Sequence, residues 1–336
     1  MALILVLTFF TVPVMAEEEG SDGGAVGLLS FLNLSEKEML SRKRAERPAY
    51  DYLIEHGVME LDKSGAPFQK VVFYDSLDSM LMGLMSGEVD ALNVPDSTAK
   101  YLSGVNDQVK QISFYHPEKA EGFTQALLNR ICNGYSFMML EENSDLRDQF
   151  DQVIAEMKAD GTLDELIKTH ITDAAERGET NKVEFEQFDG APIKVAVTGC
   201  LPPMDYVAAN GTPAGFNTAV LAEIGKRLER NIELVQVDSV GRALALAQGN
   251  VDVAFWTRGA SEGAVEDGLP SMSEEERNAF VQERRKNKAA TEEEIAIMDN
   301  LRETFPSGAY DKGDMSEGTV VTAPYYTDLN VLVTLK

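Results

Sequence analysis

Apolar positions in the first half of the chain switch between strand-like and helix-like spacing. Lys70–Tyr74 has the apolar, β-branched character of a strand, Leu77–Met85 has helical periodicity, and Val89–Val94 is again strand-like. Gly87 follows the helix, and glycine readily adopts the left-handed backbone that ends a helix. A strand, a helix and a second strand in succession form a β-α-β unit, which is the building block of a parallel sheet.

Helical patterns dominate the rest of this half. Ser35 and Glu38 have capping-box spacing, and residues 144–158 place their apolar side chains on one helical face. Asp160-Gly161 ends that helix, and the next helix begins at Thr162. Residues 176–192 lose periodicity, so we expect them to be a linker between two halves, 28–175 and 193–336.

The second half repeats the alternation of strand and helix. Ile193–Val197, Asn231–Val237 and Val251–Trp256 are the expected strands, and helices are expected to begin near Asn217 and at Arg242. The pattern predicts a second α/β unit.

One short pattern occurs in both halves. Leu84–Ala91 and Leu246–Val253 each run from a helix end, through a glycine, into a strand that begins Val-Asp. The three positions align without a gap, which favours two related lobes. We interpret Asp90 and Asp252 as residues that hold these turns rather than as ligand-binding residues.

Residues 260–315 interrupt the second half with a highly charged insertion. Capping-box patterns at Ser273–Glu276 and Thr291–Glu294 each predict a helix start, and Arg284–Lys286 suits the end of the first helix. We expect this insertion to be a solvated excursion from the surface.

Composition limits the classes of function. The 336 residues include 56 acidic and 30 basic side chains, which gives a formal net charge of −26. Such a surface repels phosphate backbones, so nucleic acid is not an expected partner. Cys132 and Cys200 are expected to be buried thiols, with a single bridge between them as the alternative. The histidines lack metal-ligand spacing, and we expect neither a metal nor another cofactor.

A short uncharged run begins the chain. Residues 1–16 are mostly apolar, fewer than the roughly 20 residues that a membrane-spanning helix needs. They end in Val14-Met15-Ala16, a pattern typical of a signal-peptide cleavage site, although no basic residue precedes the run. An uncleaved anchor is the alternative. Residues 17–27 are acidic and glycine-rich, and we expect a flexible segment there and an exported protein, in the periplasm or at the extracellular surface.

Six sequence elements of the second half stand in a recognisable order. They are Val195–Thr198, Pro202–Tyr206, Asn210-Gly211, Gly215–Asn217, Gly249–Val253 and Pro324–Tyr326. This order resembles the family-3 extracellular solute-binding proteins of amino-acid uptake transporters. The resemblance implies a two-lobed α/β fold of the periplasmic-binding-protein type II class, a Venus flytrap that closes over its ligand. The first half resembles the family's other lobe at Tyr74–Leu77, Ser86–Ala91 and Asp160–Leu163.

The two halves stand in the opposite order to that of the family. A standard member has the Pro-Pro lobe first and the Asp-Gly-Thr-Leu helix last, whereas here that helix precedes the Pro-Pro lobe. One hypothesis, which we favour slightly, is that the chain joins parts of two tandem binding units. The other is a circular permutant with one complete cleft, which is sterically feasible when termini are exposed and close together. In either case we expect the lobes to pack together.

Candidate ligand-binding residues cluster after the strand Val251–Trp256. Arg258 lies at the carboxyl edge of the sheet, where α/β proteins bind ligands, and its guanidinium suits a carboxylate. The family separates the corresponding threonine and arginine, whereas Thr257 and Arg258 are adjacent here. Trp256 is expected to line the pocket or, alternatively, to pack inside the lobe.

Three further candidates lie on other segments. Tyr206 and its neighbour Asp205, in the Pro-Pro turn, are expected to line the same pocket. Asp96 follows the strand of the first half, where the family often places an aspartate for the ligand's ammonium group. A helix N-cap near Ser97 is the alternative role for Asp96.

These features predict binding without chemistry. The chain has no nucleophile elbow, phosphate loop or dinucleotide fingerprint, so we do not expect an enzyme, and a dehydratase on the same fold is the least favoured alternative. We expect capture of a small polar ligand, such as an amino acid, by lobe closure. The expected partners are the permease and ATPase of an ABC-type uptake system. The extracellular module of a truncated sensor is the alternative.

Overall fold

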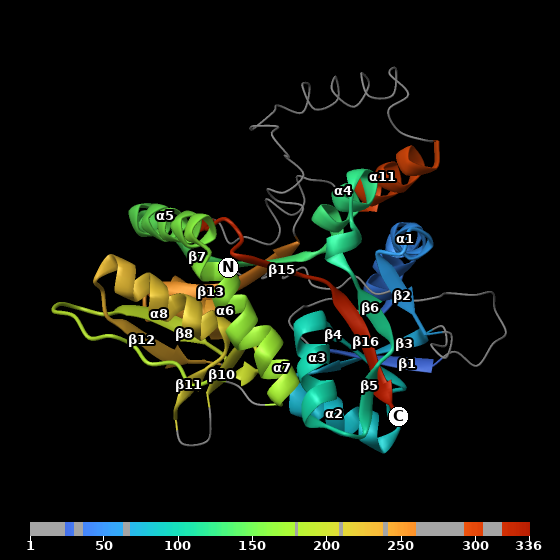
Figure 1. Ribbon diagram of the computed structural model, residues 1–336, viewed down its shortest axis with the longest axis horizontal. Coiled ribbons are helices and arrows are strands. Elements are labelled where there is room, and N and C mark those ends of the chain that lie inside the picture. Colours follow the sequence, from blue (N-terminus) through green and yellow to red (C-terminus); the bar gives the residue numbers. More distant parts are fainter. Residues whose placement is uncertain are drawn as a thin grey trace.

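The computed structural model describes residues 24–29, 36–62, 68–178, 181–207, 211–237, 241–259, 292–304 and 318–336. These residues form two α/β lobes that lie side by side (Figure 1). We name them the terminal lobe, built from residues 24–131 and 330–336, and the central lobe, built from 133–259 and 318–328. The predicted two-lobed α/β fold is confirmed.

The sheet of the terminal lobe has the strand order β3-β1-β4-β16-β5. Strands β1 (Gly24–Leu29), β3 (Phe68–Tyr74) and β4 (Ala91–Pro95) are parallel, and β16 (Asn330–Leu335) runs antiparallel to both β4 and β5 (Val109–Gln111). A short ribbon, β2 (Met59–Leu61) with β6 (Ser113–Tyr115), lies beside this sheet. The helices are α1 (Glu36–Glu55), α2 (Leu77–Ser86), α3 (Asp96–Val105) and α4 (Gly122–Ile131).

The sheet of the central lobe has the order β12-β8-β13-β7-β14. Strands β8 (Ile193–Val197), β12 (Ile232–Gln236) and β13 (Val253–Gly259) are parallel, and β7 (Asn133–Leu140) runs antiparallel to β13 and to β14 (Thr319–Val321). Its helices are α5 (Ser144–Asp160), α6 (Thr162–Ile167), α7 (Asp173–Arg177), α8 (Phe216–Leu228) and α9 (Gly241–Ala247). A π-helical turn, Lys168–Thr172, joins α6 to α7. Strands β9 (Cys200–Leu201), β10 (Asp205–Val207) and β11 (Pro213–Ala214) form a small separate sheet.

The two sheets have the same topology. In each, the first of the three parallel strands lies between the other two, and an antiparallel strand separates the third parallel strand from the strand at the edge. That antiparallel strand enters from the other lobe: β7 follows α4 of the terminal lobe, and β16 follows β15 (Tyr326–Asp328), which pairs with β7. The chain therefore crosses between the lobes at Cys132–Asn133 and at Leu329, and the two halves of the sequence complete each other's sheets.

The pattern repeated in the sequence has the same structure in both lobes. Gly87 and Gly249 end their helices with left-handed backbones, φ 76° and 69°. The carboxylate of Asp90 accepts a hydrogen bond from the Ala25 N–H at 2.6 Å, and that of Asp252 accepts one from the Lys194 N–H at 2.8 Å. Both aspartates thus tie the start of the third parallel strand to the first, whereas a role in holding the turn itself was predicted.

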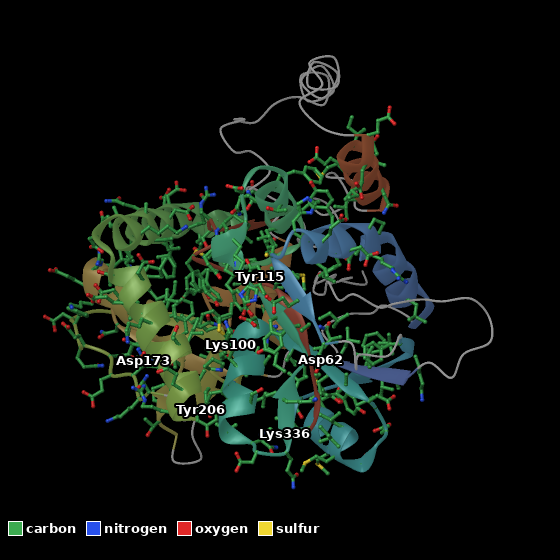
Figure 2. The ribbon with its side chains drawn as sticks, turned by 45° about the vertical axis from the view of Figure 1, so that its right-hand side comes forward. Asp62, Lys100, Tyr115, Asp173, Tyr206 and Lys336 are labelled. Atoms are coloured by element: carbon green, nitrogen blue, oxygen red, sulfur yellow. The ribbon has the colours of Figure 1, made fainter. Side chains whose placement is uncertain are left out.

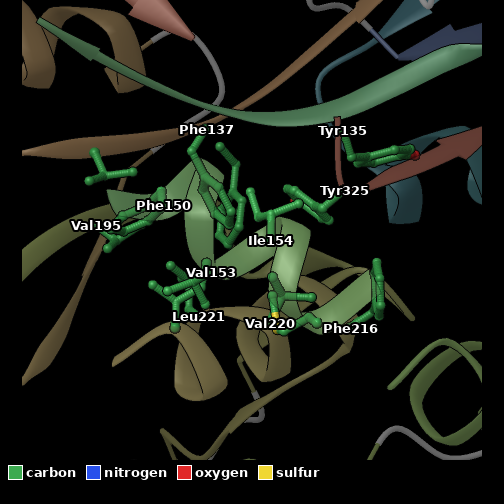
Figure 3. Close-up of a cluster of buried hydrophobic side chains, with 14 of the residues drawn as sticks. Tyr135, Phe137, Phe150, Val153, Ile154, Val195, Phe216, Val220, Leu221 and Tyr325 are labelled. Atoms are coloured by element: carbon green, nitrogen blue, oxygen red, sulfur yellow. The ribbon is translucent and has the colours of Figure 1, made fainter. Parts of the chain in front are cut away.

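Apolar clusters pack against both faces of each sheet. In the central lobe, α5 and α8 cover one face, where Phe137 stacks on Tyr325 with ring centroids 4.8 Å apart and meets Phe150 edge-to-face (Figure 3). Helix α9 packs on the other face. The segment expected to be a linker packs on this lobe as well: Val183 is buried, and the Asn231 side chain holds the backbone of Phe188.

The charged insertion departs from its prediction. Helix α11 (Glu292–Thr304) is the part of the insertion that is described, and its Ile297 and Leu301 are buried among side chains of α1 and α4. A wholly solvated excursion is therefore wrong for this helix, because its apolar residues complete a core cluster of the terminal lobe. The rest of 260–315 lies outside the described residues, as do the expected signal peptide and residues 17–23 of the segment expected to be flexible. Residues 24–27 of that segment begin β1, where Val26 is buried, so the prediction of flexibility is wrong for them.

Candidate functional site

The carboxyl edge of the central-lobe sheet holds a buried carboxylate. Asp205 on β10 is 4% exposed, and its Oδ2 accepts hydrogen bonds from both the N–H and the hydroxyl of Thr198, each at 2.7 Å. Its Oδ1 is also buried, and no described group hydrogen-bonds to it. Buried carboxylate oxygens normally have partners, so this oxygen, which has none among the described residues, is a candidate acceptor for a ligand.

The turn that carries Asp205 is fixed on the start of α8. The Phe216 N–H donates to the Pro203 carbonyl and the Asn217 N–H to the Met204 carbonyl, both at 2.8 Å. Gly215 precedes α8 with φ 98° and ψ 168°, a conformation that is essentially restricted to glycine. The family-like Pro-Pro turn and Gly-Phe motif therefore form one unit that positions Asp205 beside the first turn of α8.

Polar side chains from two other elements face the same region. The hydroxyl of Tyr325, just before β15, donates to Asn217 Oδ1 at 2.9 Å, and Nη1 of Arg242 on α9 donates to the Phe255 carbonyl at 3.2 Å. Burial raises the pKa of Tyr325 well above its ordinary value, the Asp205 charge adds to the rise, and Arg242 opposes it. A carboxylate and a guanidinium thus act on the pKa of one tyrosine in opposite directions.

The terminal lobe contributes the first turn of α3, next to the second crossing. Asp96 begins this helix, is 5% exposed, and already has two partners: Lys100 Nζ at 2.6 Å from its Oδ2 and Gln111 Nε2 at 2.8 Å from its Oδ1. Lys100 is half-exposed and lies near the middle of the molecule, where the lobes meet (Figure 2). A ligand ammonium at Asp96 would therefore have to replace the Lys100 ammonium.

A second buried acid caps α3 in place of Asp96. Asp328, from the end of β15, accepts hydrogen bonds from the Ser97 N–H at 3.1 Å and from the Leu329 N–H at 2.8 Å. Burial first, and the Asp96 charge second, raise the pKa of Asp328 to about 7. The local sequence gave no sign of this cap, because its donor and acceptor are more than 200 positions apart.

Several buried hydroxyls near the crossings have no hydrogen-bond partner among the described residues. Ser97 Oγ and Thr98 Oγ1 lie in the first turn of α3, and Ser136 Oγ lies on β7, the strand that enters from the terminal lobe. Together with Asp205 Oδ1, they place unsatisfied polar atoms in both lobes. Such atoms are uncommon in native interiors and are typical of sites that hold water or a polar ligand.

The remaining predicted site residues are placed by their backbones. Trp256, Thr257 and Arg258 lie on β13 opposite Ser136, Tyr135 and Gly134, respectively, and their side chains lie outside the described residues. The prediction that Arg258 follows the strand is wrong, since pairing with β7 extends β13 to Gly259.

Tyr206 is half-buried on β10, with Cys200 and Ala214 as its backbone neighbours. It therefore shares a strand with Asp205 but alternates with it, so that the two side chains point to opposite faces of the small sheet.

Sequence reasoning missed three members of this region. Asn217 and Tyr325 lie in motifs that were recognised for their family pattern and not for their side chains. Arg242 lies in the first turn of α9, the helix that follows β12, a carboxyl-edge position that the strand pattern alone could have indicated.

The described residues offer few other chemical centres. Cys132 is buried and free, and burial raises the pKa of its thiol to about 12, so it is a poor nucleophile. No group of three or more His, Cys, Asp or Glu side chains in the described ranges is arranged to hold a metal ion. Within the same ranges, no helix has the length and apolar character needed to cross a membrane.

Comparison with known proteins gives one sequence match. Residues 193–262 match the family model of bacterial extracellular solute-binding proteins, family 3. No curated protein sequence matches the chain.

Similar solved structures include a substrate-binding protein from Microbacterium hydrocarbonoxydans in complex with 4-hydroxybenzoate hydrazide. It is 11% identical, with a TM-score of 0.34, 79% of this chain covered and 54% of that chain. The GluR0 ligand-binding core with L-glutamate is 10% identical, with a TM-score of 0.33 and coverages of 94% and 86%. The periplasmic aliphatic sulphonate-binding protein SsuA of Escherichia coli is 13% identical, with a TM-score of 0.31 and coverages of 90% and 86%.

This chain spans little more than half of the length of the Microbacterium protein. The match over 193–262 begins at β8 and runs past the end of β13, so it covers Asp205, Asn217 and Arg242. The family resemblance predicted from the motifs is confirmed over this segment. Residues 193–262 therefore resemble a family-3 extracellular solute-binding protein, and the rest of the described chain completes a two-lobed α/β fold around this segment.

Proposed function

We propose that this protein captures a small polar solute between its two lobes, outside the cytoplasm. The observation that carries the proposal is the buried Oδ1 of Asp205, a carboxylate oxygen with no partner among the described residues. It lies at the carboxyl edge of the sheet in the segment that matches the solute-binding family. An α/β sheet binds ligands at that edge, and a solute that donates a hydrogen bond would satisfy this oxygen.

An amino acid is the solute class that best fits the charges. Asp205 would accept from the ammonium group, and Arg242 on the neighbouring helix would bind the carboxylate, with Arg258 on β13 as a second cation. A planar guanidinium binds a carboxylate through two parallel hydrogen bonds. The hydroxyls of Ser97 and Thr98 on α3 supply polar contacts from the opposite lobe.

Binding would work by shifting an equilibrium between open and closed lobes. Two crossing segments, at Cys132–Asn133 and at Leu329, join the lobes, so a rotation about them would open the space between the lobes. A solute that contacts both lobes stabilises the closed state by its differential affinity for that state. We propose that a permease and an ATPase of an ABC-type system accept the closed form and that the chain is exported to meet them.

Thermal unfolding of the whole chain with a panel of amino acids tests the proposal. At 100 times its Kd, a solute stabilises the native state by about 2.7 kcal/mol, which raises Tm by several degrees. Asp205→Asn keeps an acceptor for Thr198 and removes the charge, and we expect it to weaken binding by about 30-fold or more. Asp252→Asn is the matched control, because that aspartate holds a turn away from the site.

The amino-acid panel and the two variants can support or contradict the proposal. Stabilisation by one amino acid that Asp205→Asn loses and Asp252→Asn retains supports the proposal. If no amino acid raises Tm, an amino acid is not the solute, and if Asp205→Asn binds as tightly as the unaltered chain, Asp205 is not in the site.

A further inference from the structure

Two helices of the central lobe's chain lie on the terminal lobe. Helix α7 follows α5 and α6, which pack in the central-lobe core, and α11 lies in the chain between β13 and β14 of the central-lobe sheet. Figure 1 shows α7 beside α3, and α11 beside α1 and α4 at the far end of the same lobe. Neither contact is one of the two strand crossings.

The contact of α7 with α3 is a close approach of backbones. A Cβ atom on Gly104 of α3 would lie 2.2 Å from the Ala175 carbonyl oxygen of α7. A Cβ on Gly178, which ends α7, would lie 3.3 Å from the Gly104 carbonyl oxygen. Real Cβ atoms need more than 3 Å, so the lobes can stand this close only because residue 104 is glycine.

This contact lies away from the crossing. Helix α3 begins at the crossing, where the Asp96 N–H donates to the Leu329 carbonyl at 2.9 Å. Gly104 is eight residues further along, about 12 Å at the rise of an α-helix. Leu201 of the β9–β10 hairpin also packs against the apolar cluster of the terminal lobe that includes Leu102. Central-lobe segments therefore meet α3 along its length.

The contact of α11 is apolar and adjoins both crossings. Ile297 and Leu301 are 4% and 0% exposed, in a cluster that also contains Ile131 and Cys132 at the first crossing and Leu329 at the second. Glu294 accepts a hydrogen bond from the Tyr52 hydroxyl of α1 at 2.8 Å. Burial, and then this hydrogen bond, raise the pKa of Tyr52 to about 12.

We propose that α7 and α11 are ties that hold the two lobes together before any solute binds. A chain joined only by two crossing strands can rotate about them, whereas these docked helices oppose that rotation, α7 away from the crossings and α11 beside them. Opening then requires α7 to leave α3 and α11 to leave the α1–α4 surface. The inference goes beyond the proposed function, because it concerns the solute-free chain and holds whether or not an amino acid binds.

The test separates an interlobe contact from a contact within one lobe. Gly104→Ala wedges α7 from α3, and Gly225→Ala is its matched control, since a Cβ there would lie 2.7 Å from Ile232 within the central lobe. For α11, Leu301→Ser undocks the apolar face, and Ala296→Ser changes an exposed position of the same helix. Small-angle scattering and amide hydrogen exchange are measured on the full, solute-free chain, and urea unfolding shows that each variant folds.

The unaltered chain is expected to have a compact radius of gyration of about 20 Å. Gly104→Ala and Leu301→Ser should each increase it and speed amide exchange in the undocked helix by about 5- to 100-fold. Gly225→Ala and Ala296→Ser should leave the radius unchanged. If folded Gly104→Ala and Leu301→Ser keep the radius and the exchange rates of the unaltered chain, the ties do not hold the lobes and the proposal is overturned. Failure of the amino-acid panel would not affect this readout.

Discussion

Gly215 joins the Pro-Pro turn to α8, and its replacement tests how the candidate site is built. The perturbation is Gly215→Ala. The residue has φ 98° and ψ 168°, and an added Cβ would lie 2.8 Å from the carbonyl oxygens of both Pro203 and Met204. Those two carbonyls accept the hydrogen bonds that start α8, so neither can move without breaking one.

The magnitude follows from these two effects. A non-glycine residue in this backbone region costs about 1–3 kcal/mol. Forcing a methyl group against fixed atoms costs about 1–3 kcal/mol more. We therefore expect Gly215→Ala to lower the free energy of unfolding by about 2–6 kcal/mol.

Gly211 in the same turn region is a matched control. Its backbone is also left-handed, φ 79°, but no described atom lies within 4 Å of an added Cβ. Gly211→Ala should cost only the backbone term, about 1–2 kcal/mol. Urea unfolding of the two variants and the unaltered chain measures the difference. Equal losses for Gly215→Ala and Gly211→Ala would refute the argument, because the contact with the two carbonyls would then contribute nothing.

Three further predictions concern the buried acids, the repeated turn and the thiol. Asp328 has a native pKa of about 7 against an ordinary 3.8, so the native state binds an extra proton and the free energy of unfolding should fall as pH rises from about 4 to 7. Urea midpoints at pH 4.5 and 8 should show this fall in the unaltered chain and its loss in Asp328→Asn. If Asp328→Asn keeps the same pH dependence, the assignment is contradicted. Asp90→Ala and Asp252→Ala each remove a bond from a strand N–H to a carboxylate, so each should cost about 1–3 kcal/mol in urea unfolding, and a clearly unequal cost would argue against equivalent roles. Cys132 should resist a thiol-alkylating reagent at pH 8 until urea unfolds the chain, because burial raises the pKa of its thiol to about 12. Mass spectrometry of the labelled peptides measures this, and rapid labelling of Cys132 in the native chain would refute it.

Sequence patterns that span a few tens of residues predicted the helices, strands and caps that depend on interactions between neighbouring residues. The β-α-β unit from Lys70 to Val94 has a strand, a helix and a glycine cap within 25 residues, and it appears as β3, α2 and β4. The helix predicted at 144–158 is α5, because its apolar face meets a sheet at helical spacing. The sequence also indicated that Asp90 and Asp252 have equivalent structural roles, since a repeated Gly-x-Val-Asp pattern implies a repeated local structure.

Strand β7 shows where such patterns fail. Its first seven residues, Asn133 to Met139, are all buried, so the segment has no alternation of polar and apolar positions that would indicate a strand. The same pairing explains the error at Arg258: β13 reaches Gly259 only because β7 continues beside it. The helix start predicted at Thr291–Glu294 is confirmed by α11, and only its expected exposure to solvent was wrong. Its charged sequence contains two apolar residues, Ile297 and Leu301, that pack on a surface far away in the chain.

The candidate site likewise contains residues that sequence motifs predicted and residues that only the tertiary structure revealed. Sequence motifs predicted Asp205 and the turn that carries it, and they also indicated Asp96 as a carboxylate at a strand end. Arg242, Tyr325 and Asp328 became candidates only through their neighbours in space, such as the Ser97 N–H that Asp328 caps.

The sequence alone predicted that this protein has two α/β lobes, that both contain one helix-to-strand pattern, and that one carries the pattern of a solute-binding family. Those conclusions rest on periodicity, glycine caps and motifs, which act over tens of residues or fewer. Only the tertiary structure decided that the two halves complete each other's sheets, although their order is reversed. A β-strand can pair with any strand whose edge is free. Strand β16 pairs with β4, and the paired residues Asn330 and Pro95 are 235 positions apart, so the geometry of the whole chain selects this partner.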